Sequence, residues 1–446
     1  MNTTLSDGEI QNTTRALDAA LVPFMGRFPG SAGERQPVHT VYGGAHLFKS
    51  DTTRKLGEAA LRSLQEYGRD AMHFAEAIAL PEESLADRVW SRVFEKLKRE
   101  PVEDFRIDFE DGYGNRPDDE EDGHAAAAAR EVAKGMSEGT LPPFIGIRIK
   151  PFTQELTRRS IRTLDIFLTT LVRLSGRMLP PGFVVTLPKI QLPEQVTVLA
   201  DLYDLLEMRL GLPGRSLKLE FMIETTQSIL NERGESNLPR FLDAARGRAV
   251  AAHFGTYDYT ASCNITAAEQ RMDHPSCDFA RHMMQVAYAG TGLWLSDGAT
   301  NIMPVPRHRG EKLSRQQVDE NEATVHRAWR LHVEHIRHSL VHAYYQGWDL
   351  HPAQLPTRYA AVYSFFLEGL QPATERLSNF MQKAGQATLA GDIFDDAATG
   401  QGLLNYFIRG LNSGALKDEE ALAAGLTLEE LRSRSFVKIL KGRRGK

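Results

Sequence analysis

Short runs of apolar residues recur along the chain, separated by longer stretches in which apolar and polar residues alternate with the period of a helix. After a longer first interval, most runs start 33 to 41 residues apart, which is the length of a strand, a loop, a helix and a loop. Several are apolar at consecutive positions, as parallel strands covered on both faces are. The eight runs are "VHTVYG" near residue 38, "FRIDFED" near 105, "FIGIRIK" near 144, "FVVTLPKI" near 183, "LKLEFMIE" near 217, "VAAHFGTYD" near 250, "TGLWLSDG" near 291 and "GWDLHP" near 347.

Helical stretches fill the intervals between the runs. Two of them, "TTRKLGEAALRSLQEYG" and "DDEEDGHAAAAAREVAKGM", end at or beside a glycine, which is typical of a helix C-terminus. Eight units of strand and helix predict an α/β fold, a (β/α)8 TIM barrel with a helical C-terminal extension.

The pattern divides the chain into three regions. We predict an N-terminal helical segment over residues 1–37, the barrel over 38–355, and the C-terminal extension over 356–446, which could act as a lid. Within the extension, "TRYAAVYSFFLEGLQPATERLSNFMQKA" predicts a helix pair or one helix broken at Pro372, and "AGDIFDDAATGQG" predicts a loop.

Composition and charge narrow the class of protein. The chain of 446 residues is 42% hydrophobic and 25% charged, which is typical of a soluble globular protein. Its net charge of −5 gives no general attraction to nucleic acid or to an anionic membrane, so we expect neither as a partner. The two cysteines form no C-x-x-C pair and no apolar run reaches about 18 residues, so a cytoplasmic protein is expected.

Charged residues gather where the predicted strands end. In a TIM barrel the chemistry lies on the loops at the C-terminal ends of the strands. Carboxylates this close repel one another unless they are solvated, paired with arginine or placed around a cation. In chain order these residues are Asp108, Glu110, Asp111, Arg148, Lys189, Glu224, Asp258 and Asp297.

Two of these carboxylates suit a hard divalent cation. Glu224 and Asp258 lie 34 residues apart, one strand and helix unit, which places them on adjacent strands within reach of one Mg²⁺, or of Mn²⁺ in its place. Arg148 could hold a substrate carboxylate or a developing enolate oxygen with its fork of donors. Glu110 and Asp111 could bind the water ligands of the metal and orient Arg148.

Seven short motifs follow one another in an order that is known from one family. "DFEDGYG", "IGIRIK", "TLPKI", "FMIET", "FGTYD", "SDG" and "WDLHPAQ" together resemble the HpcH/HpaI aldolase and citrate lyase β-subunit family, within the phosphoenolpyruvate/pyruvate-binding barrel superfamily. The resemblance covers roughly residues 38 to 370. The "DFED" form is closer to the citrate lyase, malyl-CoA lyase and malate synthase branch.

The resemblance implies a Mg²⁺-dependent barrel enzyme that makes or breaks a C–C bond beside a carbonyl. It implies that Glu224 and Asp258 are the metal ligands, and that Arg148 contacts the 2-oxo acid while the backbone near Gly255 and Thr256 cradles the substrate carboxylate. Family members use the element after "HPAQ" to cover a neighbouring subunit's site, so a homo-oligomer is expected.

Three functions remain open. The first is a Mg²⁺-dependent carbon–carbon lyase or aldolase that acts, through a metal-stabilised enolate, on a 2-oxo acid or an acyl-CoA-linked hydroxy acid, with the CoA thioester as a substrate in the second case. The second is a malate synthase-like Claisen condensation of acetyl-CoA with a small oxo acid. The third is a ligand-binding barrel without catalysis, because retained residues do not establish turnover.

Simpler roles compete with each functional one. The acidic cluster could be a solvated loop, and Glu224 with Asp258 could form structural salt bridges at the rim. We expect Lys189 to pair with carboxylates rather than to form a Schiff base. The histidines of "HRAWRLHVEHIRHSLVH" lack H-E-x-x-H spacing, so we expect a polar helix face rather than a zinc site.

Overall fold

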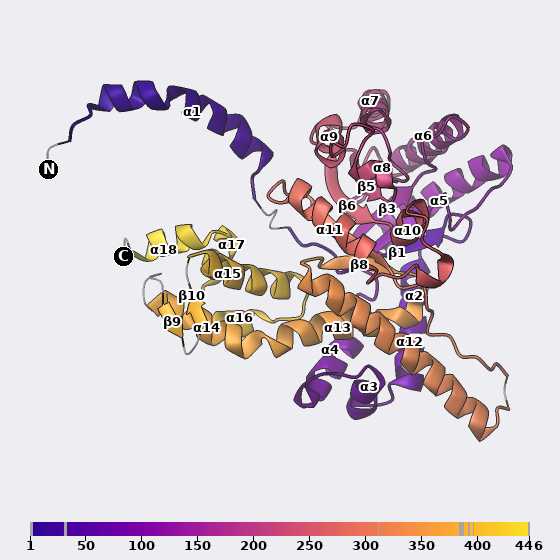
Figure 1. Ribbon diagram of the computed structural model, residues 1–446. Coiled ribbons are helices and arrows are strands. Elements are labelled where there is room, and N and C mark those ends of the chain that lie inside the picture. Colours follow the sequence, from indigo (N-terminus) through magenta and orange to yellow (C-terminus); the bar gives the residue numbers. More distant parts are fainter. Residues whose placement is uncertain are drawn as a thin grey trace.

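Eight parallel strands close into a barrel in the order of the chain, each paired with the next and the eighth with the first (Figure 1). The strands are β1 (His39–Gly44), β2 (Asp104–Asp108), β3 (Phe144–Arg148), β4 (Val184–Leu187), β5 (Lys218–Ile223), β6 (Ala249–Phe254), β7 (Trp294–Ala299) and β8 (Gln346–Asp349). The computed structural model describes residues 3–30, 34–310, 312–382, 388–390, 393–395 and 397–444. The predicted TIM barrel is confirmed, with every strand at one of the eight apolar runs.

Helices cover the outside of the barrel and explain why the strands are apolar at consecutive positions. They are α2 (Thr52–Tyr67), α3 (Ala71–Ala77), α4 (Ala86–Arg99), α5 (Asp118–Glu138), α6 (Thr157–Leu174), α7 (Pro193–Leu210), α8 (Thr226–Ile229), α9 (Leu238–Ala244), α10 (Thr256–Ser262), α11 (Pro275–Tyr288), α12 (Arg315–Val341) and α13 (Leu355–Glu368). Short 3-10 turns lie at η1 (Glu83–Leu85), η2 (Ala267–Glu269) and η3 (Pro352–Gln354). Every residue of β2 and β4 is buried, as strands between two layers should be.

Local sequence explains the helix boundaries. Helix α5 opens with four consecutive acidic residues, 118–121, whose charges favour the N-terminal end of the helix dipole. It ends at Gly139, which takes the left-handed conformation with φ +66° that a glycine adopts without strain. Helix α12 begins at a capping box in which Ser314 and Gln317 each satisfy the other's backbone N–H.

The barrel interior is ionic rather than filled by branched apolar residues. Arg106 donates from Nε and Nη2 to the two carboxylate oxygens of Glu220, over 2.8 and 2.7 Å, and its Nη1 binds Asp104. Thr40 donates to Asp104 over 2.8 Å, and His253 lies 3.2 Å from Glu220. These groups are buried, so their mutual bonds replace lost hydration. The network fills the interior below the C-terminal rim.

The C-terminal extension is helical, but it breaks elsewhere than predicted. The helix pair consists of α13 and α14 (Leu370–Gln382), divided at Gly369 rather than at Pro372. Pro372 is the third residue of α14, where a missing N–H breaks no intrahelical bond. The rest comprises β9 (Thr388–Ala390), β10 (Ile393–Asp395), α15 (Ala397–Asn412), α16 (Asp418–Leu422), α17 (Leu428–Ser433) and α18 (Phe436–Arg444). The predicted loop over 390–402 is therefore wrong, because its described residues belong mainly to the β9/β10 pair and to α15.

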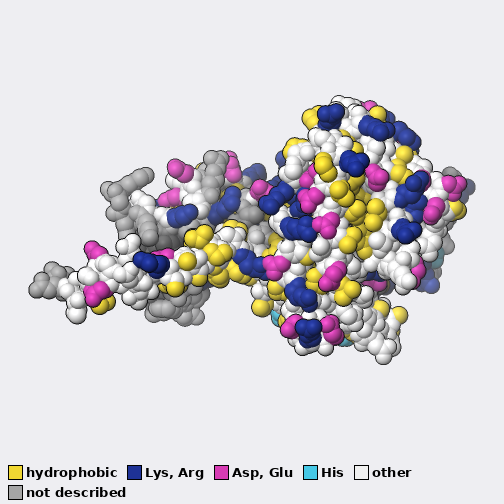
Figure 2. Space-filling model, turned by 90° about the horizontal axis from the view of Figure 1, so that it is seen from above, with side chains coloured by type: hydrophobic (Ala, Val, Ile, Leu, Met, Phe, Trp, Pro, Cys, Tyr) yellow, Lys and Arg dark blue, Asp and Glu magenta, His cyan; other side chains and the backbone are white. Residues whose placement is uncertain are grey.

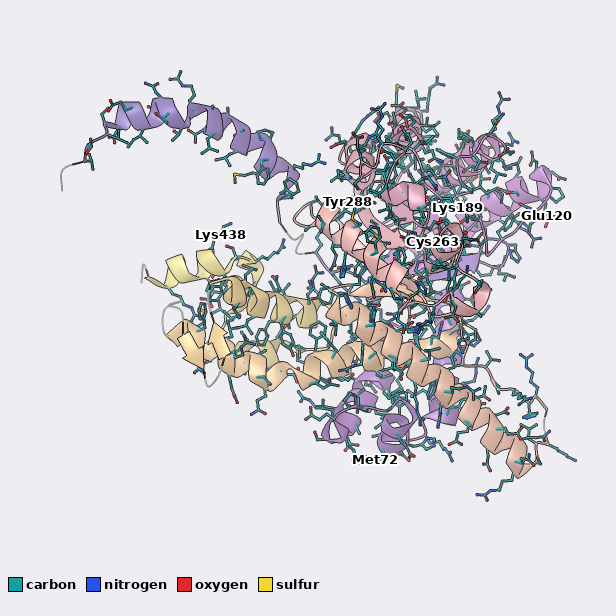
Figure 3. The ribbon with its side chains drawn as sticks, in the orientation of Figure 1. Met72, Glu120, Lys189, Cys263, Tyr288 and Lys438 are labelled. Atoms are coloured by element: carbon teal, nitrogen blue, oxygen red, sulfur yellow. The ribbon has the colours of Figure 1, made fainter. Side chains whose placement is uncertain are left out.

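Two parts of the chain extend away from the barrel. Figure 1 shows α14 to α18 to one side of it, and Figure 3 shows the labelled Lys189 on the barrel well away from these helices. Within one chain, therefore, the extension does not cover that rim. Helix α1 (Asp7–Arg27) also stands clear of the body (Figure 1). No helix in the described ranges is long and apolar enough to cross a membrane.

Candidate functional site

Arg148 is the most firmly held charged group at the C-terminal rim. It closes β3, is buried, and donates from Nε and Nη2 to the two oxygens of Asp108 over 2.7 and 2.6 Å. Its Nη1 lies 2.9 Å from Glu110. The rings of Tyr42 and Trp348 face the guanidinium, with centroids 4.8 and 5.6 Å from its carbon. The guanidinium is therefore fixed in orientation before any substrate arrives.

Asp108 organises both the arginine and the following loop. Its carboxylate also accepts the backbone N–H groups of Glu110 and Gly112, over 3.0 and 2.7 Å. Burial alone would raise the pKa of Asp108, but the guanidinium of Arg148 and these N–H donors outweigh it and hold the pKa below its ordinary value. Asp108, which had no assigned role, is thus the principal partner of Arg148, and Asp111 lies farther off at 3.7 Å.

Lys189 lies among the acidic residues of the rim. Its Nζ is 2.6 Å from Glu110, 3.2 Å from Asp258 and 3.6 Å from Asp111. Its backbone has a φ of +50°, uncommon for a residue with a side chain, and its N–H donates to Glu224 over 2.7 Å. The predicted pairing of Lys189 with carboxylates is confirmed, and both its side chain and its backbone contact site residues.

Glu224 is a buried carboxylate next to two others. Burial, together with repulsion from Glu110 and Asp258, raises the pKa of Glu224 well above its ordinary value, and the nearby Lys189 only partly offsets this. Such a group binds a proton or a cation readily, because either removes the cost of a buried negative charge.

Gly255 lets the side chain of Glu224 pack directly against the backbone of the neighbouring strand end. A Cβ atom at this position would lie 2.5 Å from the Cβ of Glu224 and 2.6 Å from its Oε2. A side chain at this position would displace the Glu224 carboxylate, which together with Asp258 offers hard oxygen donors. The residues present fit Mg²⁺ or Mn²⁺, both of which favour oxygen ligands.

The predicted substrate contacts of Gly255 and Thr256 need one correction. The N–H of Gly255 donates to the carbonyl of Ile223 over 3.0 Å, so it is not free for a substrate carboxylate. Thr256 begins α10, where N–H groups have no intrahelical acceptor, but its hydroxyl is buried against the sulfur of Met272 at 3.1 Å. The contact between a substrate carboxylate and the backbone N–H of Thr256 stays a prediction.

Asp297 does not join the site although it also lies near a strand end. Its carboxylate lies 2.9 Å from Nη1 of Arg281 on α11 and accepts a bond of 2.6 Å from Ser339 on α12. Both partners belong to the outer helices, so Asp297 faces away from the barrel axis. Its role is to join β7 to two helices.

Comparison with known protein families assigns the chain to a family. A family model described as a domain of unknown function, DUF6986, matches residues 17–439. The chain belongs to the DUF6986 family. None of the curated protein sequences compared with the chain matches it.

Several solved structures are similar to this DUF6986 protein at low sequence identity. A citrate lyase from Burkholderia xenovorans LB400 is 18% identical, with a TM-score of 0.58 over 87% of this chain and 96% of that one. The magnesium/glyoxylate complex of Haloferax volcanii malate synthase is 13% identical, with a TM-score of 0.45 over 89% and 97%. An HpcH/HpaI aldolase/citrate lyase family protein from Burkholderia cenocepacia J2315 is 11% identical, with a TM-score of 0.40 over 80% and 98%. The similarity to the citrate lyase shows a shared barrel fold.

Gly255→Ala tests whether metal binding in this DUF6986 protein depends on the position of the Glu224 carboxylate. The added methyl group meets the Glu224 carboxylate, so we expect Mg²⁺ affinity to fall about 10- to 100-fold while the barrel stays folded. Isothermal titration calorimetry measures the affinity and circular dichroism the fold. Gly214→Ala is the matched control, because no atom lies within 4 Å of its Cβ position. Equal affinity of Gly255→Ala and the wild type would place the metal elsewhere.

A cavity lies at the opposite, N-terminal end of the barrel. It measures about 470 Å³ and is lined by residues at the N-terminal ends of the strands, among them Asp104, Phe144, Lys218 and Trp294. None of the predicted site residues lines it. The candidate site is therefore defined by converging charges at the rim rather than by cavity volume.

The histidines of α12 form two groups and a buried pair. His326 lies near His73 and Glu322, but Arg69 already binds Glu322 at 2.7 Å. His338 and His342 lie near Asp278, which Arg281 holds at 2.7 Å. The prediction of a polar helix face is wrong for the two others, His332 and His335, which are buried.

Sequence reasoning gave no role to two aromatic residues that hold the site together. Tyr42 and Trp348 face Arg148 from β1 and β8, which are neighbours in the closed barrel but far apart in the chain. Trp348 also donates to His253 over 3.3 Å. The sequence places both residues on predicted strands. That they lie side by side follows only from the pairing of the first strand with the eighth in the closed barrel.

Proposed function

We propose that this protein is a Mg²⁺-dependent carbon–carbon lyase that acts on a 2-oxo acid or an acyl-CoA-linked hydroxy acid through a stabilised enolate. The observation that supports this best is the buried Glu224 carboxylate, which packs against Gly255 and whose pKa is raised by burial and by its neighbours Glu110 and Asp258. The guanidinium of Arg148, which Asp108 holds in a fixed orientation on the same rim, also supports the proposal. A structural salt bridge at Glu224 would require a side-chain cation bound to its carboxylate, and none of the ion pairs found among the described residues involves it.

Each residue has a role that follows from its surroundings. Glu224 and Asp258 would hold the Mg²⁺, which when bound acts as a Lewis acid toward the oxygens of the oxo acid. Lys189 contacts both Asp258 and Glu110, and an ion at Asp258 would shift its ammonium toward Glu110, the nearer partner. Lys189 then keeps Glu110 neutralised without competing for the metal ligands.

Arg148 would neutralise the charge that develops on the substrate oxygen. A guanidinium has five N–H donors. Two bind Asp108 and one faces Glu110, which leaves two for a substrate. Because Tyr42 and Asp108 already hold it in place, little reorganisation accompanies charge development, which is the condition under which such donors are most effective.

The test is proton exchange into pyruvate followed by ¹H NMR in D₂O. We expect the wild-type protein to replace methyl protons by deuterium in the presence of Mg²⁺ and not after chelation with EDTA. Exchange that is unaffected by chelation would contradict a metal-stabilised enolate. If pyruvate does not exchange, the same experiment on acetyl-CoA with glyoxylate decides between the malate synthase-like condensation and a barrel without catalysis.

A further inference from the structure

Helix α1 is a well-formed helix that buries nothing. Its 21 residues begin at a capping box in which Ser6 and Glu9 each bond the other's backbone, and acidic side chains occupy its first turn. No residue of the helix is buried, and Figure 1 shows it projecting from the body. A single helix of this length is only marginally stable in water without packing against an apolar surface.

One face of this helix is apolar along its whole length. The spacing of seven, four, three and four residues places its members in a narrow line on a helix with 3.6 residues per turn. This line, which we call the arm stripe, consists of Ile10, Leu17, Leu21, Phe24 and Phe28, with exposures of 46, 57, 39, 58 and 36%. Figure 2 shows hydrophobic side chains gathered on the part of α1 nearest the barrel.

Contacts with α9 and with the end of α11 hold the base of α1 against the barrel. Arg27, in the last turn, forms an ion pair with Asp243 and donates to the carbonyl of Pro239 over 3.4 Å, both on α9. Gly30 donates to the carbonyl of Gly290, just beyond α11, over 2.8 Å. A helix of 21 residues is about 31 Å long, so its N-terminal half lies far from these contacts and from the body (Figure 1).

A matching apolar face lies beside this base. Phe279, Met283 and Val286 follow one another at four and three residues along α11, and Phe279 and Val286 are 51% and 82% exposed. Helix α11 ends at Tyr288, close to the carbonyl that anchors the arm. Because the arm base and this α11 face are neighbours, a two-fold axis beside them brings each arm onto the α11 face of the other chain.

We propose that the arm stripe binds the α11 face of a second copy of this chain, and that the two copies exchange their arms. Each arm offers roughly 500 Å² of apolar surface and the shorter α11 face roughly 300 Å², so about 300 Å² is covered on each side and two arms with two acceptor faces remove roughly 1,200 Å² from water, the lower end of the range for a specific interface. This gives the expected homo-oligomer a specific interface, independent of the reaction at the rim.

The test measures molar mass in solution by size-exclusion chromatography with light scattering. We expect a dimer for the wild type, and dissociation at least 100-fold easier for Leu17→Asp with Leu21→Asp and also for Val286→Asp. Val22→Asp is the matched control, because Val22 is 74% exposed on the same helix but about 120° away from the stripe, and it should remain dimeric.

Two other results would contradict the proposed exchange of arms. A monomeric wild type would show that no second copy covers the arm, and a dimer that persists in the double variant would place the interface elsewhere. If the aspartate variants fail to fold, deletion of residues 1–26 is the second test. The truncated chain should be a folded monomer by circular dichroism and light scattering, and a dimeric truncated chain would contradict the proposal.

Discussion

Mg²⁺ binding is expected to strengthen about tenfold per pH unit over the range in which Glu224 still holds a proton, and Glu224→Gln is expected to weaken binding at least 100-fold and to remove this dependence. The pKa of Glu224 lies well above its ordinary value of 4.5, first because of burial and then because of repulsion from Glu110 and Asp258. At any pH below this raised pKa, the ion must displace a proton. Raising the pH removes that proton beforehand and favours binding, and lowering the pH opposes it.

The measurement is calorimetric titration with Mg²⁺ at several pH values and in buffers of different protonation enthalpy, which together give the number of protons released. We expect about one proton per ion below the pKa of Glu224, affinity at least 100-fold weaker for Glu224→Gln, and pyruvate exchange reduced by about a thousandfold. Glu232→Gln, whose side chain is 78% exposed, should match the wild type. An affinity that does not change with pH would show that Glu224 is already ionised without metal.

The same carboxyl links pH to folding in the metal-free protein. A folded-state pKa above the unfolded value means that the folded state binds a proton more tightly, so the contribution of Glu224 to stability is lost as pH rises through its folded-state pKa. Bound Mg²⁺ removes this loss because it takes the place of the proton.

The barrel could be predicted from the sequence because its strands are covered on both faces. A run such as "FRIDFED" then carries apolar residues at consecutive positions, and the repeat of strand and helix sets the spacing. The C-terminal region lacked such a repeat. There, the break at Gly369 rather than Pro372 depended on packing, since proline is accommodated in the first turn of α14.

The site could be predicted only in part, because a strand end does not tell which way a side chain points. Successive strand residues face opposite sides, so Arg148 faces the axis while Asp297 faces α11 and α12. The hydrogen bonds of the backbone could not be predicted from the sequence either. The N–H of Gly255 is taken by the adjacent strand, whereas the importance of this glycine lies in the side chain that it lacks.

Arg148→Lys is expected to lower the rate of pyruvate exchange by about a thousandfold while the dissociation constant for Mg²⁺ changes less than about threefold. A lysine ammonium cannot fill the two-oxygen fork of Asp108 and still present donors to a substrate. It also loses the planar contact with the rings of Tyr42 and Trp348. The metal ligands are separate residues, so binding of the ion should survive.

The matched control for this substitution is Arg358→Lys. Arg358 is also buried and donates from Nε and Nη2 to Asp349, over 3.1 and 2.9 Å, but it lies on α13 outside the barrel. Both variants lose a buried fork, so both should lower the urea midpoint of unfolding. Only Arg148→Lys should slow exchange per folded molecule. Equal exchange rates in the two variants would show that Arg148 supports the fold alone, and would remove the charge-stabilising residue from the proposed reaction.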